Sequence, residues 1–443
     1  MSKNKPLKTV IVGGASITWL PVFLKDLCKS KAMEGGTVVL NDIDTEMLNT
    51  MKTFSEAVVA EKGCKITIET ETDLEKTLIG ADYVICTVLV GGHAVWKDEM
   101  NLILKYGIKH PKGMSIGPGG MIMGLKQIPF ILGLAKRMEK LCPDAWLLNF
   151  SNPMQLITLA VQRYSSIKCI GLCHGLDGTI AKIAEWLEVP VKELSFTAGG
   201  VNHFEFVTRL EKDGVDMFPA LIGKLEEIDR TTGDYGDRAT MEAYKLFGAF
   251  PTNHDIHVLE FLPYQIVRSE LEKFRLTHNY IENRMADRGS RWEKLHDYIN
   301  GKRPLSEIVK EKVTEKLAEI IDSIATNTPY VLYANVTNKG YIRNLGDYFC
   351  VGVPVVLNRD GYEGCCIGNL PVGAAALSGV HGAVQDYIVE ACMSGSRKLC
   401  LSALSLDPMC YSLTSEQRMD LINELIDMNQ QYLPAFFENA PEV

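Results

Sequence analysis

Two short polar segments carry the side chains with the clearest capacity for chemistry. The first contains Cys173 and His174, the second contains Asn202 and His203, and each follows a run that reads as a β-strand. One thiolate and one imidazole are a sparse donor set, because structural zinc sites normally take four protein ligands. A sparse site leaves positions open for substrate oxygens and water, so Cys173 and His203 are candidate ligands of a catalytic metal. The alternative is a buried structural thiol, the commoner fate of a cysteine.

A glycine turn near the N-terminus is a second candidate site. The β-branched run 8–12 leads into Gly13 and Gly14, and a helical pattern follows. A dinucleotide turn usually has glycine at its third position, where this chain has Ala15. Asp42 ends the next predicted strand, where a carboxylate grips a ribose diol and disfavours the extra phosphate of NADP. We therefore predict NAD binding. The expected cofactor contacts are Gly13, Gly14, Ala15, Ser16, Asp42 and Val88.

Two further stretches offer polar side chains. Asn152 precedes a proline, which holds it extended, so its amide could reach a sugar hydroxyl; an ordinary turn asparagine is the equal alternative. Downstream, three titratable residues, His254, Asp255 and His257, lie within four consecutive positions. A catalytic base or another group of the metal site is the sharper interpretation, and a solvated loop is the alternative.

The first part of the chain alternates strands with helical stretches. The strands are nearly all apolar, as in a buried parallel sheet, so the pattern predicts an α/β fold with a Rossmann-like doubly wound sheet. The expected strands are 8–12, 37–41, 65–70, 83–88, 146–150 and 169–172.

After about Gly200 helices dominate, and short strands interrupt them. This change predicts a second mixed α/β, helix-rich domain. We expect an NAD-binding domain at 1–199 and a substrate- and metal-binding domain at 200–443. The expected helices are 238–247, 305–325, 380–394 and 416–432, and the expected strands are 331–336 and 351–357.

The bulk composition narrows the class of protein. The 443 residues are 46% hydrophobic with a net charge of −9, which argues against a nucleic-acid surface. We find no export signal and no run of about 18 apolar residues, so we expect neither secretion nor a membrane span. The 12 cysteines lack a disulfide framework spacing, which favours free thiols and a reducing cytoplasm.

In combination, these motifs resemble glycoside hydrolase family 4, the NAD- and manganese-dependent glycosidases, nearly end to end. The resemblance implies that Cys173 and His203 hold Mn²⁺ and that Asn152 and Asn202 contact the sugar. The matching segments are the opening strand and turn, 41–44, 90–92, 117–120, 152–153, 173–175, 200–203, 338–340 and 406–408.

The residue after the metal cysteine separates groups within this family. Phospho-sugar members carry Asp or Asn there, whereas His174 resembles members that act on unphosphorylated α-glycosides and α-uronides. The resemblance makes His174 a general acid, Asp255 a candidate base and Tyr244 the alternative base. Ile256 replaces an arginine found in some uronide-cleaving relatives, and its absence weakens the uronide interpretation.

The implied reaction is hydrolysis of an α-glycoside of the glucosidase or galactosidase type. NAD would take hydride from C3, the aglycone would leave by elimination, and water addition would precede hydride return. An α-glucuronidase or α-galacturonidase is the alternative within the family. An NAD-dependent hydroxy-acid dehydrogenase or a non-catalytic NAD sensor is the alternative outside it. The family also leads us to expect a homodimer or homotetramer.

Overall fold

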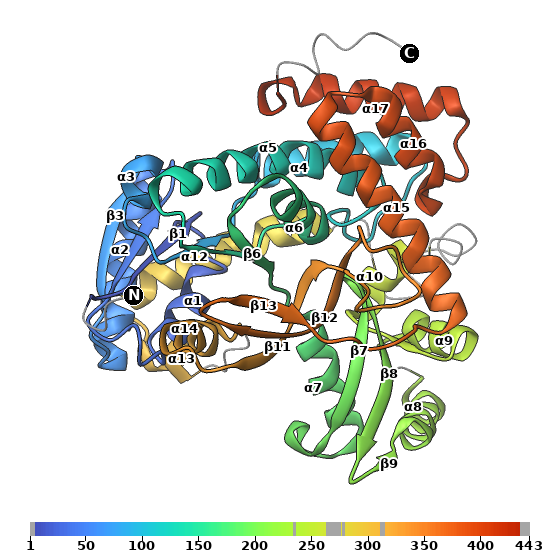
Figure 1. The fold of residues 1–443 in the computed structure, drawn as a ribbon, viewed down its shortest axis with the longest axis horizontal. Helices are drawn as coiled ribbons and strands as arrows, with labels where there is room; N and C mark the ends of the chain where they lie inside the picture. Colours follow the sequence, from blue (N-terminus) through green and yellow to red (C-terminus); the bar gives the residue numbers. More distant parts are fainter. Residues whose placement is uncertain (1–4, 234–235, 263–275, 277–279, 311–314, 435–443) are drawn as a thin grey trace.

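The computed structural model describes residues 5–233, 236–262, 276, 280–310 and 315–434 (Figure 1). Their strands form one mixed sheet in the order β10-β8-β7-β12-β11-β6-β5-β4-β1-β2-β3, with β9 and β13 pairing at its side. None of the helices in these ranges is long and apolar enough to cross a membrane.

The first half of the sheet is parallel. Its order, β6-β5-β4-β1-β2-β3, is that of a doubly wound dinucleotide-binding sheet, which confirms the predicted fold class. Five of its strands are buried along almost their whole length, as the continuous apolar runs require. The bounds are β1 Lys8–Val12, β2 Thr37–Asn41, β3 Thr67–Glu71, β4 Tyr83–Cys86, β5 Trp146–Asn149 and β6 Lys168–Gly171.

The second half of the sheet is antiparallel, and it joins the first half where β11 pairs with β6. Asn335 of β11 pairs with Gly171 of β6, and Gly352 of β12 pairs with Gly200 of β7. The expected boundary at 199/200 falls inside β7, and the division into two domains stays a prediction. The bounds are β7 Ser195–Val201, β8 Phe204–Lys212, β9 Val215–Asp216, β10 Phe250–Pro251, β11 Tyr330–Thr337, β12 Cys350–Asn358 and β13 Gly361–Gly364.

The helices of the first half connect its parallel strands and cover the sheet (Figure 1). The longest, α5, is buried along most of its length and contains the sequence Gly-Pro-Gly-Gly in its first turn. The bounds are α1 Leu20–Leu27, α2 Thr45–Lys62, α3 Leu74–Leu78, α4 Gly92–Lys105, α5 Gly117–Leu141, α6 Met154–Tyr164 and α7 Gly175–Leu187.

The later helices agree with the expected ones in position. Helix α9 has the expected bounds, whereas α15 begins eight residues before the expected start, Val380, because glycines at 373 and 379 weaken its apparent helix propensity. The expected helix 305–325 spans α13 and α14, and its residues 311–314 lie outside the described ranges. The bounds are α8 Phe218–Thr232, α9 Arg238–Phe247, α10 His254–Phe261, α12 Tyr280–Ile299, α13 Ser306–Lys310, α14 Leu317–Thr326, α15 Val372–Ser394, α16 Arg397–Leu406 and α17 Ser415–Met428.

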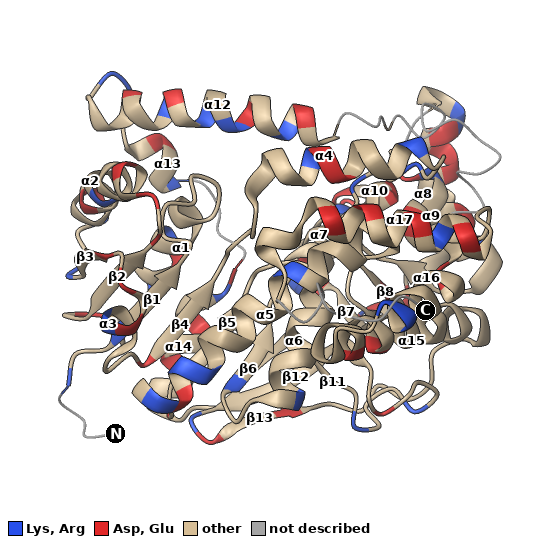
Figure 2. Ribbon diagram, turned by 90° about the horizontal axis from the view of Figure 1, so that it is seen from above, with Lys and Arg blue, Asp and Glu red and all other residues tan. Residues whose placement is uncertain are grey.

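One helix from the second half lies against the first. Helix α12 packs on α2 and α4 and runs along one side of the molecule, from α13 toward α4 (Figure 2). Its inward face carries Ile281, Arg284 and Arg288, which are buried or partly buried. The second half of the chain therefore covers part of the nucleotide-type half.

The twelve cysteines are all free thiols, as their spacing predicted. Most are buried in the core, Cys173 is partly buried, and Cys366 is exposed.

Candidate active site

The structure brings the two polar segments together. Cys173 lies two residues beyond β6, and Asn202 and His203 form the two-residue turn between β7 and β8. Strands β11 and β12 separate β6 from β7 in the sheet. The Asn202 side chain nevertheless hydrogen-bonds to the Cys173 thiol, so the two segments meet at one place.

The Cys173 thiol sits among polar partners. Its Sγ accepts a hydrogen bond from the backbone N–H of Gly175 at 3.4 Å. Burial raises the pKa of the thiol to about 11, while the hydrogen bonds from Asn202 and Gly175 favour the thiolate. A cation bound beside the sulfur would favour the thiolate further, since coordinated thiols lose their proton.

His203 is held in one orientation. Its φ of 66° lies in the left-handed region, which a tight turn between two antiparallel strands requires. Its Nδ1 lies 2.7 Å from the Ser115 hydroxyl, which leaves Nε2 for another ligand. Burial lowers the pKa of His203 well below its ordinary value, so the imidazole is neutral, the form that binds metals.

These residues fit a divalent metal of the open, catalytic kind. The described residues contain no cluster of three or more His, Cys, Asp or Glu that could hold an ion, so Cys173 and His203 would be its two ligands. Several buried polar atoms of the candidate site residues and of Gln155 have no hydrogen-bond partner in the described part of the chain. They are Asn152 Oδ1, Gln155 Oε1, Asn202 Oδ1 and His257 Nδ1. Such orphaned atoms are what a site completed by substrate and water would present.

A second imidazole and a lysine extend the site. The ring of buried His257 stacks on that of His203 with centroids 3.9 Å apart. The Nε2 of His257 lies 2.8 Å from Lys112 Nζ. Burial lowers the pKa of Lys112 to about 8, against the opposing charges of Glu260 and Cys173. A positive side chain thus lies one ring away from a candidate metal ligand.

Glu260 fixes the loop that carries this lysine. The fully buried Oε1 of Glu260 accepts hydrogen bonds from the backbone N–H groups of Lys112 and Gly113 at 3.1 and 2.5 Å. His110 Nδ1 lies 2.9 Å from the same oxygen. The loop between α4 and α5 is therefore tied to α10, and Lys112 is placed by the fold.

The glycine turn is built around Asn41 and Asp42. The N–H groups of Gly13 and Gly14 both donate to the Asn41 carbonyl, at 2.9 and 2.8 Å. A Cβ on Gly14 would lie 2.8 Å from that of Leu40, so the turn passes too close to β2 for a side chain. The expected ribose ligand, Asp42, accepts the N–H of Ala15 at 3.0 Å. Ser16 Oγ accepts the N–H of Trp19 at 3.2 Å.

One buried glutamine links the expected cofactor and substrate contacts. Gln127 Nε2 donates to the carbonyl oxygens of Val88 and Asn152, at 2.6 and 3.2 Å. Its Oε1 accepts the N–H of Val90 at 3.2 Å. The loops after β4 and β5 therefore have fixed relative positions.

His174 is half exposed at the start of α7. Its Nδ1 lies 3.4 Å from a carboxylate oxygen of Glu315, and its ring centroid is 5.7 Å from that of Trp19. Trp19 belongs to the segment between the glycine turn and α1. The contact between His174 and Trp19 therefore places the segment of Cys173 and His174 beside the nucleotide turn.

Asp255 has structural partners. Its buried carboxylate accepts the N–H groups of Ala239 and Thr240 at 3.0 and 2.9 Å, and the Thr240 hydroxyl at 3.0 Å. These donors form the first turn of α9, so Asp255 satisfies orphan amides at a helix start. The stretch expected as a possible solvated loop is helix α10, with Asp255 and His257 buried.

Tyr244 packs in a separate apolar cluster around α7 and α8. Its ring stacks on Phe218 at 5.3 Å and lies 6.1 Å from Phe250. Among the described residues, no hydrogen bond, ion pair or ring contact connects Tyr244 to Cys173 or His203. The roles of Tyr244 and Asp255 in catalysis therefore stay predictions.

Four residues of this site had no functional role in the sequence interpretation: Ser115, Lys112, Glu260 and Gln127. Ser115 and Lys112 precede the Gly-Pro-Gly-Gly segment 117–120, which entered the sequence analysis only as one of the segments that match the family. Their spacing carries no periodic signal, since both belong to an irregular loop that Glu260 fixes from 147 or more residues away.

Comparisons with known proteins give the same family for almost the whole chain. A model described as family 4 glycosyl hydrolase matches residues 8–189, and the model of its C-terminal domain matches residues 198–410. An α-galactosidase of Bacillus subtilis (strain 168) is 28% identical over 434 residues, covering 97% of this chain and 99% of the relative. An α-glucosidase of Erwinia rhapontici is 27% identical, covering 96% and 98%. An α-galacturonidase of Lachnoclostridium phytofermentans is 25% identical, covering 98% of each.

Solved structures show the same fold. The lplD protein of Bacillus subtilis has a TM-score of 0.84 at 24% identity, covering 95% of this chain and 99% of the other. A 6-phospho-α-glucosidase from gut microorganisms, solved with NAD and Mn²⁺, has a TM-score of 0.79 at 20% identity, covering 97% and 99%.

Proposed function

The chain belongs to family 4 of the glycosyl hydrolases, and from this premise we propose that it hydrolyses unphosphorylated α-glycosides with bound NAD and Mn²⁺. It is a glycosidase, and a net dehydrogenase is not favoured. The observation that carries the proposal is the meeting of Cys173 and neutral His203 beside a doubly wound sheet with a glycine turn.

Different residues would hold the metal and bind the sugar. When bound, NAD supplies a hydride acceptor for C3 of the sugar, and the metal supplies a Lewis acid. Cys173 and His203 would hold the metal, with Ser115 orienting His203. The orphaned Oδ1 atoms of Asn152 and Asn202 would accept hydrogen bonds from sugar hydroxyls.

Proton transfer to the aglycone is the role of His174. Its ring is half exposed, so it can reach an incoming glycosidic oxygen, and Glu315 faces Nδ1. This leaves Nε2 to donate to the leaving oxygen. Loss of the aglycone by elimination needs no pair of catalytic carboxylates.

The base that removes the C2 proton is Asp255 or Tyr244 in this proposal. Tyr244→Phe keeps the stacking on Phe218 and removes only the hydroxyl, and Asp255→Asn keeps an acceptor for α9. Each variant is assayed for exchange of the C2 proton with deuterated solvent. The base is the residue whose variant loses exchange while still binding NAD and Mn²⁺.

A panel of nitrophenyl α- and β-glycosides, neutral and acidic, tests the proposed function. With NAD⁺, Mn²⁺ and reductant, we expect release of nitrophenol without accumulation of NADH. A dehydrogenase would instead produce NADH in proportion to product. Substrate deuterated at C2 should show slowed turnover or washout of the label; the absence of both would contradict elimination.

Cys173→Ser tests the metal assignment. We expect loss of Mn²⁺-dependent turnover with NAD⁺ binding retained, because the glycine turn is built around Asn41 and Asp42. Cys366→Ser, on the surface, is the matched control. Full activity of the Cys173 variant in the presence of a chelator would remove the basis for the assignment.

We also propose a cytoplasmic homodimer or homotetramer with an NAD-binding part at 1–199 and a substrate part at 200–443. The free thiols support the reducing compartment. Light scattering of the purified protein at several concentrations determines the number of subunits.

A further inference from the structure

Among the described residues, Lys112 has no carboxylate in direct contact with its ammonium group. In the described part of the chain, no carboxylate oxygen lies within ion-pair distance, 4.0 Å, of its Nζ. Its nearest polar neighbour is the Nε2 of His257 at 2.8 Å, and the Tyr280 ring lies 5.5 Å away. Glu260 affects it through space but directs its Oε1 to backbone N–H groups. A partly buried ammonium in this position is costly unless an anion comes to it.

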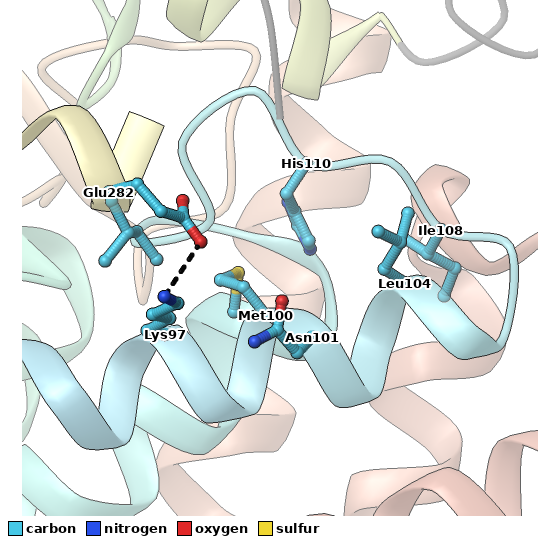
Figure 3. A pocket seen from close by; sticks show the side chains of 8 residues that line it. Lys97, Met100, Asn101, Leu104, Ile108, His110 and Glu282 are labelled. Atoms are coloured by element: carbon cyan, nitrogen blue, oxygen red, sulfur yellow. Dashed lines mark ion pairs between the residues drawn. The ribbon is translucent and has the colours of Figure 1, made fainter. Parts of the chain in front are cut away.

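A second cation acts on the same region. Arg284 of α12 is partly buried, and its charge lowers the pKa of Lys112 and of His93. Among the ion pairs of the described residues, Arg284 has no partner either. Nearby, the ion pair between Lys97 and Glu282, at 3.5 Å, joins α4 to α12 beside His110 (Figure 3). Helix α12 is thus held where Arg284 adds positive potential near Lys112.

The lysine also has a defined position relative to the reacting groups. The single imidazole of His257 separates Lys112 from the ring of His203. A sugar whose C2 and C3 face the metal ligands places its C5 substituent on the opposite side of its ring. In the arrangement we infer, Lys112, one imidazole away from His203, faces that substituent. The arginine missing at Ile256 is therefore not the only way to supply a cation here.

We propose that Lys112, supported by Arg284, is the specificity-determining residue for a carboxylate at C5 of the sugar, so that the preferred substrates are α-uronides. This inference rests on the proposed glycosidase function and names its substrate class. One ammonium and one guanidinium match a monoanionic carboxylate.

The first test needs no variant. The wild-type protein with NAD⁺ and Mn²⁺ is titrated calorimetrically with galacturonate, glucuronate, galactose and glucose. We expect at least one uronate to bind roughly 30-fold more tightly than its neutral counterpart, a factor typical of a partly buried ion pair. Equal or tighter binding of the neutral sugars would overturn the inference.

Variants then assign the preference to this side chain. Lys112→Met should lose most of the preference for uronate, in binding and in the ratio of kcat/KM between uronide and neutral glycoside. Lys112→Arg should retain part of it, because the charge remains. Lys105→Met removes an exposed lysine of α4 and is the matched control. Retention of the full preference by Lys112→Met would contradict the assignment.

The outcomes separate this inference from the proposed function. Hydrolysis of neutral glycosides in preference to uronides would leave the glycosidase intact and overturn the role of Lys112. A preference for 6-phosphoglycosides over uronides would also overturn it. If no glycoside were hydrolysed, the proposed function would fail, while the binding comparison would still decide whether the site selects a carboxylate.

Discussion

Ser115 determines which nitrogen of His203 is free to bind a cation. Its hydroxyl, 2.7 Å from Nδ1, fixes the ring orientation, and both residues are buried. Partners of this kind typically contribute 10–100-fold to metal affinity. We expect Ser115→Ala to weaken Mn²⁺ binding by roughly that factor, measured by electron paramagnetic resonance of free Mn²⁺, and to leave NAD⁺ binding unchanged. Ser115→Thr, which keeps the hydroxyl, is the control, and equal affinity in all three proteins would contradict the role.

Asp255 gives the fold a specific dependence on pH. Burial raises the pKa of its carboxyl from 3.8 to about 6, so the folded state holds this proton more tightly than the unfolded chain does. Its contribution to the free energy of unfolding therefore falls as pH rises from about 4 to about 6 and is constant above that.

Asp255→Asn should not show this fall. The stability of the wild type relative to the variant should drop by at most about 3 kcal/mol across that range, measured as the difference in Tm at pH 4.5, 5.5, 6.5 and 7.5. Parallel Tm profiles would mean that Asp255 does not titrate in this way. A pKa near 6 also belongs to a carboxyl that could exchange protons near neutral pH, so this measurement bears on its proposed role as a base.

Residue types at strand ends were predictable, whereas residues that act from loops were not. Cys173 and Asn152 come shortly after apolar runs, so the sequence places them at the carboxyl edge of a parallel sheet, and His203 comes shortly after the run that forms β7. Lys112 and Ser115 reach the site because Glu260 binds their loop across the fold. Asp255 carries a carboxylate that could act as a base, but this carboxylate binds the first turn of α9. No local sequence pattern predicts that contact.

At the scale of elements, the turn between β1 and α1 depends on the absence of a side chain at Gly14. A Cβ there would lie 2.8 Å from the Leu40 Cβ and 2.9 Å from the Asn41 nitrogen, so the turn would have to move away from β2. Overpacking of this kind costs about 1–3 kcal/mol. We expect Gly14→Ala to weaken NAD⁺ binding roughly tenfold or more, measured by calorimetry, with Mn²⁺ binding retained.

Gly223→Ala provides the control for that substitution. Gly223 lies in α8, and a Cβ added to it would meet no atom within 4 Å. The Gly223→Ala variant should therefore bind NAD⁺ as the wild type does. Unchanged affinity in Gly14→Ala as well would show that this turn does not hold the cofactor.

Strands and helices with a clear pattern of apolar residues were predicted at nearly their observed positions. Strands β1 and β2 and helix α9 have the expected bounds. The hairpin partner β8 and helix α8 were not predicted. Helix α15 was predicted too short at its start, where two glycines argue against a helix by propensity and burial overrides that preference.

At the scale of the whole molecule, one sheet runs through both halves of the chain. The pairing of β6 with β11 joins the two halves, and the largest apolar cluster contains residues from both. We expect a single cooperative thermal transition. NAD⁺ at 100 times its Kd should stabilise the protein by about 2.7 kcal/mol and slow hydrogen exchange in β5 and in β12 alike. Two separate transitions, with NAD⁺ protecting only the first half, would favour independent domains.

Cys366 offers a practical use of the surface. It is exposed, and a hydrogen bond from the Gly368 backbone N–H, together with the nearby Arg343, lowers the pKa of its thiol. Burial raises the pKa of Cys173 instead. One equivalent of a maleimide dye near neutral pH should therefore label Cys366 first. The enzyme thus has a native attachment point for a fluorophore or a solid support that spares its metal ligand.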